Sequence, residues 1–194
     1  MGKKTLMIEV FLRSILPPFY SFSMIESVCK KKLKKMPTDK DVLWVLSNLY
    51  VNYKEFDKAK HPLESLYKMG KRTRPVTLLL ARVYYNLNQY GKVKEVLTDK
   101  EFLSPNDQEN YYLGDSLIQL KEFKSAAKCL AKYINYHKDE YVPFEKLGYA
   151  YYMQGLFDLA MDAYKMAEKI EPTNREIGKS IELCKEKIGN GVAH

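Results

Sequence analysis

The chain has 194 residues and a formal net charge of +8, a length that is ordinary for one domain. The charge lies near the start, because residues 1–40 hold nine Lys and Arg against three Asp and Glu while the remainder is nearly neutral. Three widely spaced cysteines without a CxxC pair argue against a disulfide framework or a zinc site, and we expect buried thiols in a reducing compartment.

Residues 1–39 form a leader that begins with an apolar run at residues 5–16. Pro17 and Pro18 end this run after about a dozen residues, where about 20 are needed to span a bilayer. No convincing small-x-small cleavage site follows, so we expect no export and a cytoplasmic location.

The expected helix carries more apolar surface than one neighbour covers, which favours contact with another chain or a membrane face. The alternative is a helix folded onto the first repeat as a cap. The apolar positions expected to make these contacts are Leu6, Ile8, Phe11, Leu12 and Ile15.

A second helix is expected in the leader after the prolines. Ser23 and Glu26 have the spacing of a capping box at its start. Five lysines follow, namely Lys30, Lys31, Lys32, Lys34 and Lys35. They favour an anionic membrane surface or an acidic protein as partner, and the alternative is a solvated helix face. Nucleic acid is not an expected partner, because no aromatic residues are interleaved with the lysines.

From residue 40 onward a pattern of about 34 residues recurs in four segments, 40–73, 74–106, 107–140 and 141–174. The last copy is the clearest, with Leu147 and Gly148 at positions 7 and 8, Tyr151 at 11, Ala160 at 20 and Tyr164 at 24. The helical spacing of apolar residues predicts two helices per copy, and small residues at positions 8 and 20 allow them to approach closely. One copy cannot bury both apolar faces, so the copies are expected to stack.

The copy at 74–106 departs from this pattern. It is one residue short, and Val93 stands at position 20 where the other copies have alanine. We therefore expect its two helices to be splayed or locally adjusted.

This spacing resembles the tetratricopeptide repeat family over residues 40–174, about two-thirds of the chain. The resemblance implies an all-α fold, a right-handed α-solenoid of helix-turn-helix repeats. The leader then ends in a degenerate repeat, since Pro37 stands where a proline closes a unit. Residues 175–188 are expected to form a capping helix that covers the last repeat, and residues 189–194 a frayed tail.

The resemblance also implies a concave groove lined by positions 2, 5, 9, 12 and 13 of each first helix. These partner-binding positions are Trp44, Asn48 and Asn52, then Leu78, Arg82, Tyr85 and Asn86, then Tyr111, Asp115 and Gln119, and finally Glu145, Tyr149 and Tyr152. Val51, Ile118 and Met153 fall on the same positions. Aromatic and amide side chains suit an extended peptide. The alternative for Tyr85 and Tyr152 is packing between helices, and for Arg82 and Asp115 a mutual ion pair.

One subfamily can be set aside, the repeats that clamp acidic chaperone C-termini. Of the five positions that define the clamp only Asn48 matches, the others being Trp44, Leu79, Gln108 and Tyr112. The three histidines are scattered and no glycine-rich phosphate loop is present, so we expect no catalysis, cofactor or metal.

The sequence therefore predicts a non-catalytic interaction scaffold that holds protein or peptide segments and forms homo-oligomers through its N-terminal helix. In size, repeat number and degenerate first repeat it resembles the magnetosome-associated tetratricopeptide proteins of magnetotactic bacteria. That resemblance implies self-assembly on the cytoplasmic face of an organelle membrane. The alternatives are a dimeric chaperone for secreted translocator proteins and a monomeric peptide-binding adaptor.

Overall fold

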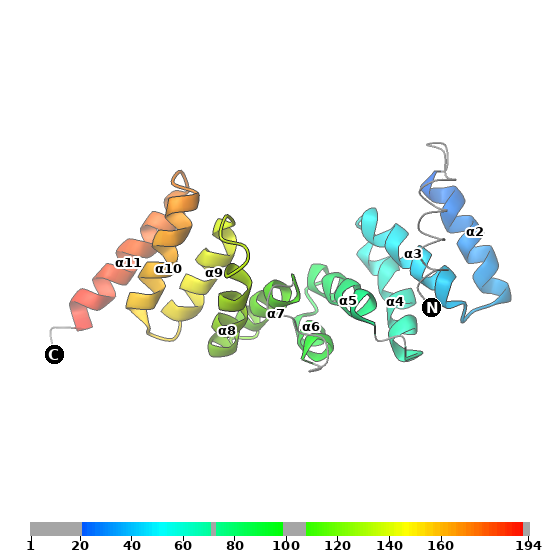
Figure 1. Cartoon of the computed structure of the whole chain (residues 1–194), viewed down its shortest axis with the longest axis horizontal. Coiled ribbons are helices and arrows are strands. Elements are labelled where there is room, and N and C mark those ends of the chain that lie inside the picture. Colours follow the sequence, from blue (N-terminus) through cyan, green and yellow to red (C-terminus); the bar gives the residue numbers. More distant parts are fainter. Residues whose placement is uncertain (1–20, 71–72, 99–107, 192–194) are drawn as a thin grey trace. The chain divides into compact units, whose positions relative to one another are not determined.

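The computed structural model describes residues 21–70, 73–98 and 108–191, which form helices joined by short turns (Figure 1). The apolar run of the leader, with Leu6, Ile8, Phe11, Leu12 and Ile15, lies outside the described residues. The chain divides after Leu87 into two compact units. Unit 1 holds α2 (Phe22–Lys35), α3 (Lys40–Asn52), α4 (Phe56–Lys68) and α5 (Arg74–Asn86). Unit 2 holds α6 (Tyr90–Leu97), α7 (Gln108–Gln119), α8 (Phe123–Ile134), α9 (Tyr141–Tyr152), α10 (Phe157–Ile170) and α11 (Arg175–Gly191).

Unit 1 is a stack in which each helix packs on the next, α2 on α3, α3 on α4 and α4 on α5. Leu43, Leu66 and Val76 come from three successive helices and form one buried cluster. The boundary between the units lies in the turn of the predicted repeat 74–106, so α5 belongs to unit 1 and α6 to unit 2. The splaying of this pair and the right-handed path of the solenoid concern both units and stay predictions.

The predicted capping box at the start of α2 is wrong. Ser21 is the N-cap, and Ser23 already lies inside the first turn, where its side chain is not the cap. The Glu26 carboxylate instead accepts a hydrogen bond from the Tyr50 hydroxyl at 2.7 Å and pairs with Lys30 at 2.8 Å. Glu26 therefore stabilises the packing of α2 on α3 and does not cap the start of α2.

Unit 2 repeats one motif, an antiparallel helix pair: α7 packs on α8, α8 on α9, α9 on α10 and α10 on α11. Small residues decide how closely each pair approaches. A Cβ atom added to Gly114 would lie 2.8 Å from Cγ of Leu130, and one added to Gly148 would lie 2.8 Å from Cδ1 of Tyr164. Position 8 of the repeat thus lies directly on position 24. Close approach of the helices at position 8 was predicted, whereas its partner at position 24 is a finding of the structure.

The turn between the two helices of each repeat contains a residue in the left-handed region, which the apolar periodicity does not indicate. These residues are Lys54, Asn88, Lys121 and Gly155, with φ of 59°, 55°, 61° and 74°. All four stand at position 15 of their repeats. In three turns the next amide reaches back to the carbonyl five residues earlier, as Leu156 does to Tyr151 at 3.0 Å. This is the bond of a Schellman motif, which satisfies a terminal carbonyl of the first helix.

The C-terminal helix extends further than predicted. The expected helix 175–188 continues to Gly191, so the start of the predicted tail is helical. An exposed glycine costs a helix only about 1 kcal/mol, and no proline intervenes to stop it. Ile177, Ile181 and Cys184 are buried against Phe144 and Tyr164, in the manner of a capping helix.

Two of the three cysteines are buried, Cys29 and Cys184, and Cys129 is half-buried. Burial raises the pKa of the Cys129 thiol and of both others. The burial of Cys29 and Cys184 agrees with the expectation of buried thiols. Within the described ranges, no helix has the length and apolar character that a membrane span requires.

Candidate partner-binding groove

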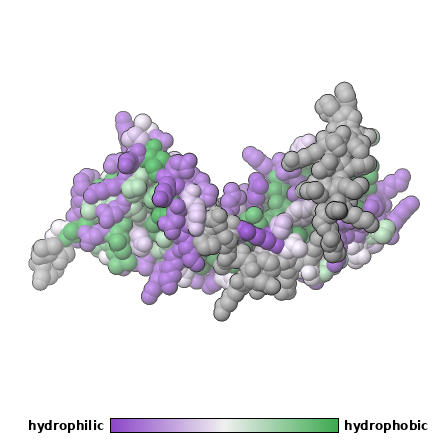
Figure 2. All heavy atoms as spheres, in the orientation of Figure 1, coloured by the Kyte–Doolittle hydropathy of each residue, from purple (hydrophilic) through white to green (hydrophobic). Residues whose placement is uncertain are grey.

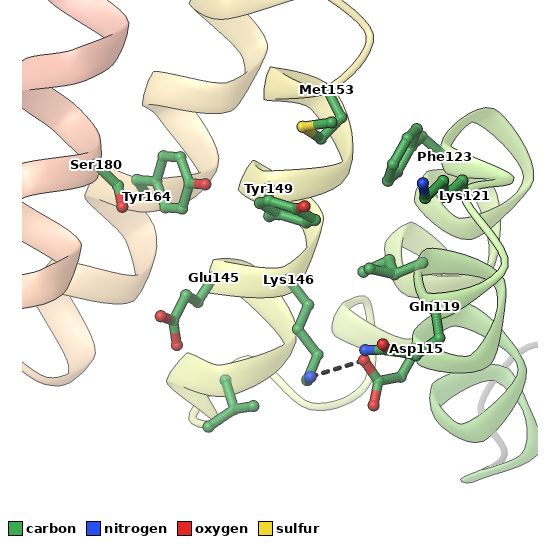
Figure 3. A pocket seen from close by; sticks show the side chains of 12 residues that line it. Asp115, Gln119, Lys121, Phe123, Glu145, Lys146, Tyr149, Met153, Tyr164 and Ser180 are labelled. Carbon is green, nitrogen blue, oxygen red and sulfur yellow. Dashed lines mark hydrogen bonds and ion pairs between the residues drawn. The ribbon is translucent and has the colours of Figure 1, made fainter. Parts of the chain in front are cut away.

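A pocket of about 600 Å³ in unit 2 is built by the faces of first helices (Figure 3). Asp115, Ile118 and Gln119 lie three and four residues apart on α7 and therefore point to one side of that helix. Glu145, Tyr149 and Met153 do the same on α9. All six were predicted groove positions, and the structure brings them to one hollow. Ser180 from α11 completes the lining, so three consecutive first-type helices contribute.

Asp115 and Lys146 form an ion pair within this pocket. Lys146 Nζ donates to Asp115 Oδ1 at 2.7 Å, and the Asp115 side chain is only 5% exposed (Figure 3). Such a pair ties α7 to α9 and neutralises the buried carboxylate. Lys146 was not among the predicted residues. The predicted alternative, an Asp115–Arg82 pair, joins the two units and stays a prediction.

An aromatic and apolar shelf forms one wall of the pocket. The ring of Phe123, the first residue of α8, packs edge-on against Tyr149 with 6.1 Å between ring centroids. Tyr149 and Met153 remain 42% and 45% exposed. Large, partly exposed side chains of this kind provide contact area for a partner at a small entropic cost.

The opposite wall carries Glu145, Tyr164 and Ser180. Lys146 points toward α7 in Figure 3, whereas Glu145 points to the other side of α9. Burial, foremost, and the nearby Cys184 and Glu145 raise the pKa of the Tyr164 hydroxyl. The side chain of Ser180 acts in the opposite direction and lowers that pKa in part.

No family model matches this sequence, and no curated protein matches it. Solved structures do match. One, described as YrrB, a TPR protein with an unusual peptide-binding site, has a TM-score of 0.77 and 16% identity, and the match covers 94% of this chain and 92% of that one. A crystal structure of MamA has a TM-score of 0.70 and 22% identity over 77% of this chain and 82% of that one. MamA from Desulfovibrio magneticus RS-1 has a TM-score of 0.64 and 17% identity over 78% and 93%.

The fold is that of tetratricopeptide repeat proteins. The sequence resemblance to magnetosome-associated tetratricopeptide proteins agrees with the likeness to MamA. At these identities the likeness establishes the fold, and the function has to be argued from the groove.

The groove positions of unit 1 lie on α3 and α5. Trp44 packs against the cluster of Leu43, Leu66 and Val76. The Asn48 amide donates to the Trp44 carbonyl at 2.8 Å and the Asn86 amide to the Arg82 carbonyl at 2.8 Å. These two amides are thus satisfied by their own helices, and their oxygens remain as acceptors for a partner. Asn52 and Arg82 are exposed, Leu78 and Tyr85 are half-buried, and Val51 is buried.

Two predicted tyrosines of unit 2 lie outside the pocket. Tyr152 packs edge-on against Phe157 at 5.4 Å between centroids and contacts the core of the last repeat, as the packing alternative had it. Tyr111 lines a second hollow of about 350 Å³ together with Tyr112 and Tyr133.

Several lining residues were missed by sequence reasoning. Lys121 and Phe123 belong to the turn and the start of the second helix, whereas only first-helix positions had been considered. Lys146 stands at position 6, four residues after Val142 and three before Tyr149, so helical spacing already placed it on the same face. Lys146 could therefore have been predicted from its spacing in the sequence. Phe123 and Ser180 could be found only from how the helices pack.

The five lysines of α2 are all exposed, but they are not equivalent. Lys30 pairs with Glu26 at 2.8 Å and Lys32 with Asp39 at 3.0 Å. Lys31 and Lys35 share a helix face with the exposed side chains of Met24 and Val28. The apolar and basic parts of α2 therefore lie along one side. Figure 2 shows hydrophilic side chains over much of one face of the described surface, with hydrophobic side chains in smaller groups between them.

No group of three or more His, Cys, Asp or Glu side chains among the described residues is arranged to hold a metal ion. His137 stacks on Tyr133 with 4.0 Å between centroids and contacts Glu140 Oε1 at 3.0 Å. This cluster is accounted for by packing at the end of α8.

Proposed function

We propose that the chain is a non-catalytic interaction scaffold that holds protein or peptide segments on the face formed by the first helices of its repeats. The observation that carries the proposal is the pocket of unit 2, to which α7, α9 and α11 contribute side chains of mixed apolar and polar character. Its shelf of Phe123, Tyr149 and Met153 has the composition of a binding hot spot. The description of YrrB as a peptide-binding TPR protein supports the proposal by analogy of fold.

The groove is tested by one substitution and a matched control. Tyr149→Ala removes an exposed ring from the shelf, and Tyr136→Ala removes an equally large ring that is 60% exposed outside the pocket. Affinity capture with the full chain, followed by direct binding of the captured protein, is expected to fail for Tyr149→Ala and to persist for Tyr136→Ala. Combining Tyr149→Ala with Arg82→Ala extends the test to unit 1. Undiminished capture by both variants, with unchanged helical content, would place the binding surface elsewhere.

The proposal includes self-assembly through the apolar leader helix, with one copy's leader docking on the groove of the next. A head-to-tail contact of this kind does not need to close and builds chains. Light scattering of the full chain is expected to show large particles, and Phe11→Asp with Ile15→Asp to reduce them to monomers. Identical monomers in both samples would leave the adaptor alternative. A dimer that persists at every concentration would favour the chaperone alternative.

A peripheral location on the cytoplasmic face of a magnetosome or another membrane is the last part of the proposal. It is supported by the face of α2 that carries Met24, Val28, Lys31 and Lys35. Each lysine near an anionic surface contributes about 1 kcal/mol of attraction, which salt weakens. The organelle is proposed from the sequence resemblance to magnetosome-associated tetratricopeptide proteins, and the likeness in fold to MamA agrees with that resemblance.

Vesicle sedimentation tests this location. Binding to phosphatidylserine-containing vesicles is expected to fall sharply when the three lysines of α2 without an ion pair among the described residues are replaced by Glu. These are Lys31, Lys34 and Lys35. A control with the same change in charge replaces three exposed lysines of α10 and α11, namely Lys165, Lys169 and Lys187. Equal loss in both variants would mean a diffuse charge effect without a defined membrane-binding face.

A further inference from the structure

The two carboxylates of the unit 2 pocket, Asp115 and Glu145, differ in whether a cation lies beside them. Asp115 is neutralised by Lys146 at 2.7 Å. Glu145, one residue before Lys146, is half-buried and forms no ion pair or hydrogen bond with any described residue. A carboxylate that is partly removed from water gains most from a cation brought to it, because burial has already weakened its hydration.

The surroundings of Glu145 suit a long cationic side chain. The Tyr149 ring lies one helical turn further along α9 and is 42% exposed, so it can cover a methylene stem or face a guanidinium group. The Tyr164 hydroxyl and Ser180 lie on the far side and add polar groups. Beyond Tyr149, the shelf of Phe123 and Met153 offers apolar contact area.

We propose that Glu145 binds a Lys or Arg side chain of the partner segment, and that Tyr149, Met153 and Phe123 take an adjacent apolar side chain. This inference rests on the proposed function, because it names the chemistry of the segment held in the same groove. The partner is thus a peptide segment in which a basic residue neighbours a large apolar residue. Glu145 sets the charge preference, and the shelf supplies most of the contact area.

Selection from a random library of short displayed peptides on the full chain tests this. The selected peptides are expected to be enriched in Lys or Arg at one position beside an apolar residue. A synthetic peptide of that sequence is expected to bind Glu145→Gln about 10-fold to 100-fold more weakly than the wild type, the range for loss of a charged hydrogen bond. Selection on Glu145→Lys is expected to shift that position to Asp or Glu. Glu186→Gln, the same loss of a carboxylate charge at an exposed position of α11 outside the pocket, serves as the matched control and should leave the preference unchanged.

The failures of the two proposals are distinguishable. Peptides that lack a basic position, or that bind Glu145→Gln as tightly as the wild type, overturn the charge assignment. If the same peptides still lose binding to Tyr149→Ala, the groove itself stands. Failure to select any peptide, or binding that is indifferent to Tyr149→Ala, overturns both. Far-UV circular dichroism of each variant guards against a loss of fold.

Discussion

The contact between Gly148 and Tyr164 gives the sharpest test of how the repeats pack. In Gly148→Ala the new Cβ would lie 2.8 Å from Cδ1 and 2.9 Å from Cε1 of the Tyr164 ring. The ring is 5% exposed and packed among Phe144, Ile177 and Ile181, so a shift of the ring would disturb these contacts. Overpacking of this kind costs about 2 kcal/mol, and the better helix propensity of alanine returns about 1 kcal/mol. The expected net loss is about 1 kcal/mol, or about 3 °C in Tm.

Gly178→Ala is the matched control. Gly178 lies within α11, and an added Cβ would meet only Glu168 Oε1 at an ordinary 3.7 Å. This variant keeps the propensity gain without the clash and is expected to be more stable by about 0.5–1 kcal/mol. Urea unfolding followed by far-UV circular dichroism measures both. The single tryptophan, Trp44 in α3, reports separately on unit 1 by its fluorescence. If Gly148→Ala were as stable as Gly178→Ala, close approach at position 8 would not be what the glycine provides.

Three further groups of substitutions test the turns, a helix cap and the pocket ion pair. Lys121 has a left-handed backbone (φ 61°), so Lys121→Gly is expected to raise the free energy of unfolding by about 1 kcal/mol. Gly155→Ala, at φ 74°, should lower it by a similar amount. If urea unfolding gave both variants a change of the same sign, the assignment of these turns would be contradicted. Burial raises the pKa of the Asp39 carboxyl, but the hydrogen bond from the Val42 amide and the Lys32 ammonium outweigh it and hold that pKa below its ordinary value. Its contribution is therefore present above the unfolded-state pKa and is lost as the pH falls through the lower folded-state pKa. Asp39→Asn retains a cap but does not titrate, so it should flatten the acid limb that the wild type shows when stability is measured against pH. Lys146→Met leaves the buried carboxylate of Asp115 without this cation and should lower the free energy of unfolding by about 2 kcal/mol, measured by thermal unfolding. Adding Asp115→Asn should restore part of that loss. Equal stability of the single and double variants would mean that the pair is only a surface contact.

The helices themselves follow from local rules that the sequence states plainly. Leu147, Tyr151 and Tyr164 recur at helical spacing, and small residues mark where two helices must approach, so element type, order and pairing could be predicted. The same periodicity predicts one shared face for the groove positions of neighbouring repeats, and Asp115, Gln119, Glu145 and Tyr149 do come together in the pocket.

Local sequence rules do not predict which side chains complete a surface that several helices form together. Phe123 and Ser180 enter the pocket only because α8 and α11 pack where they do, and Tyr152 leaves it because its ring packs on Phe157 instead. The spacing of Glu26 predicted a role in a helix cap. In the structure its carboxylate accepts a hydrogen bond from the hydroxyl of Tyr50, which lies 24 residues away on the next helix. The sequence by itself determined the repeating helix pairs, since their period is local; the tertiary structure decided the partners of the polar groups, since those depend on distances between residues far apart in the chain.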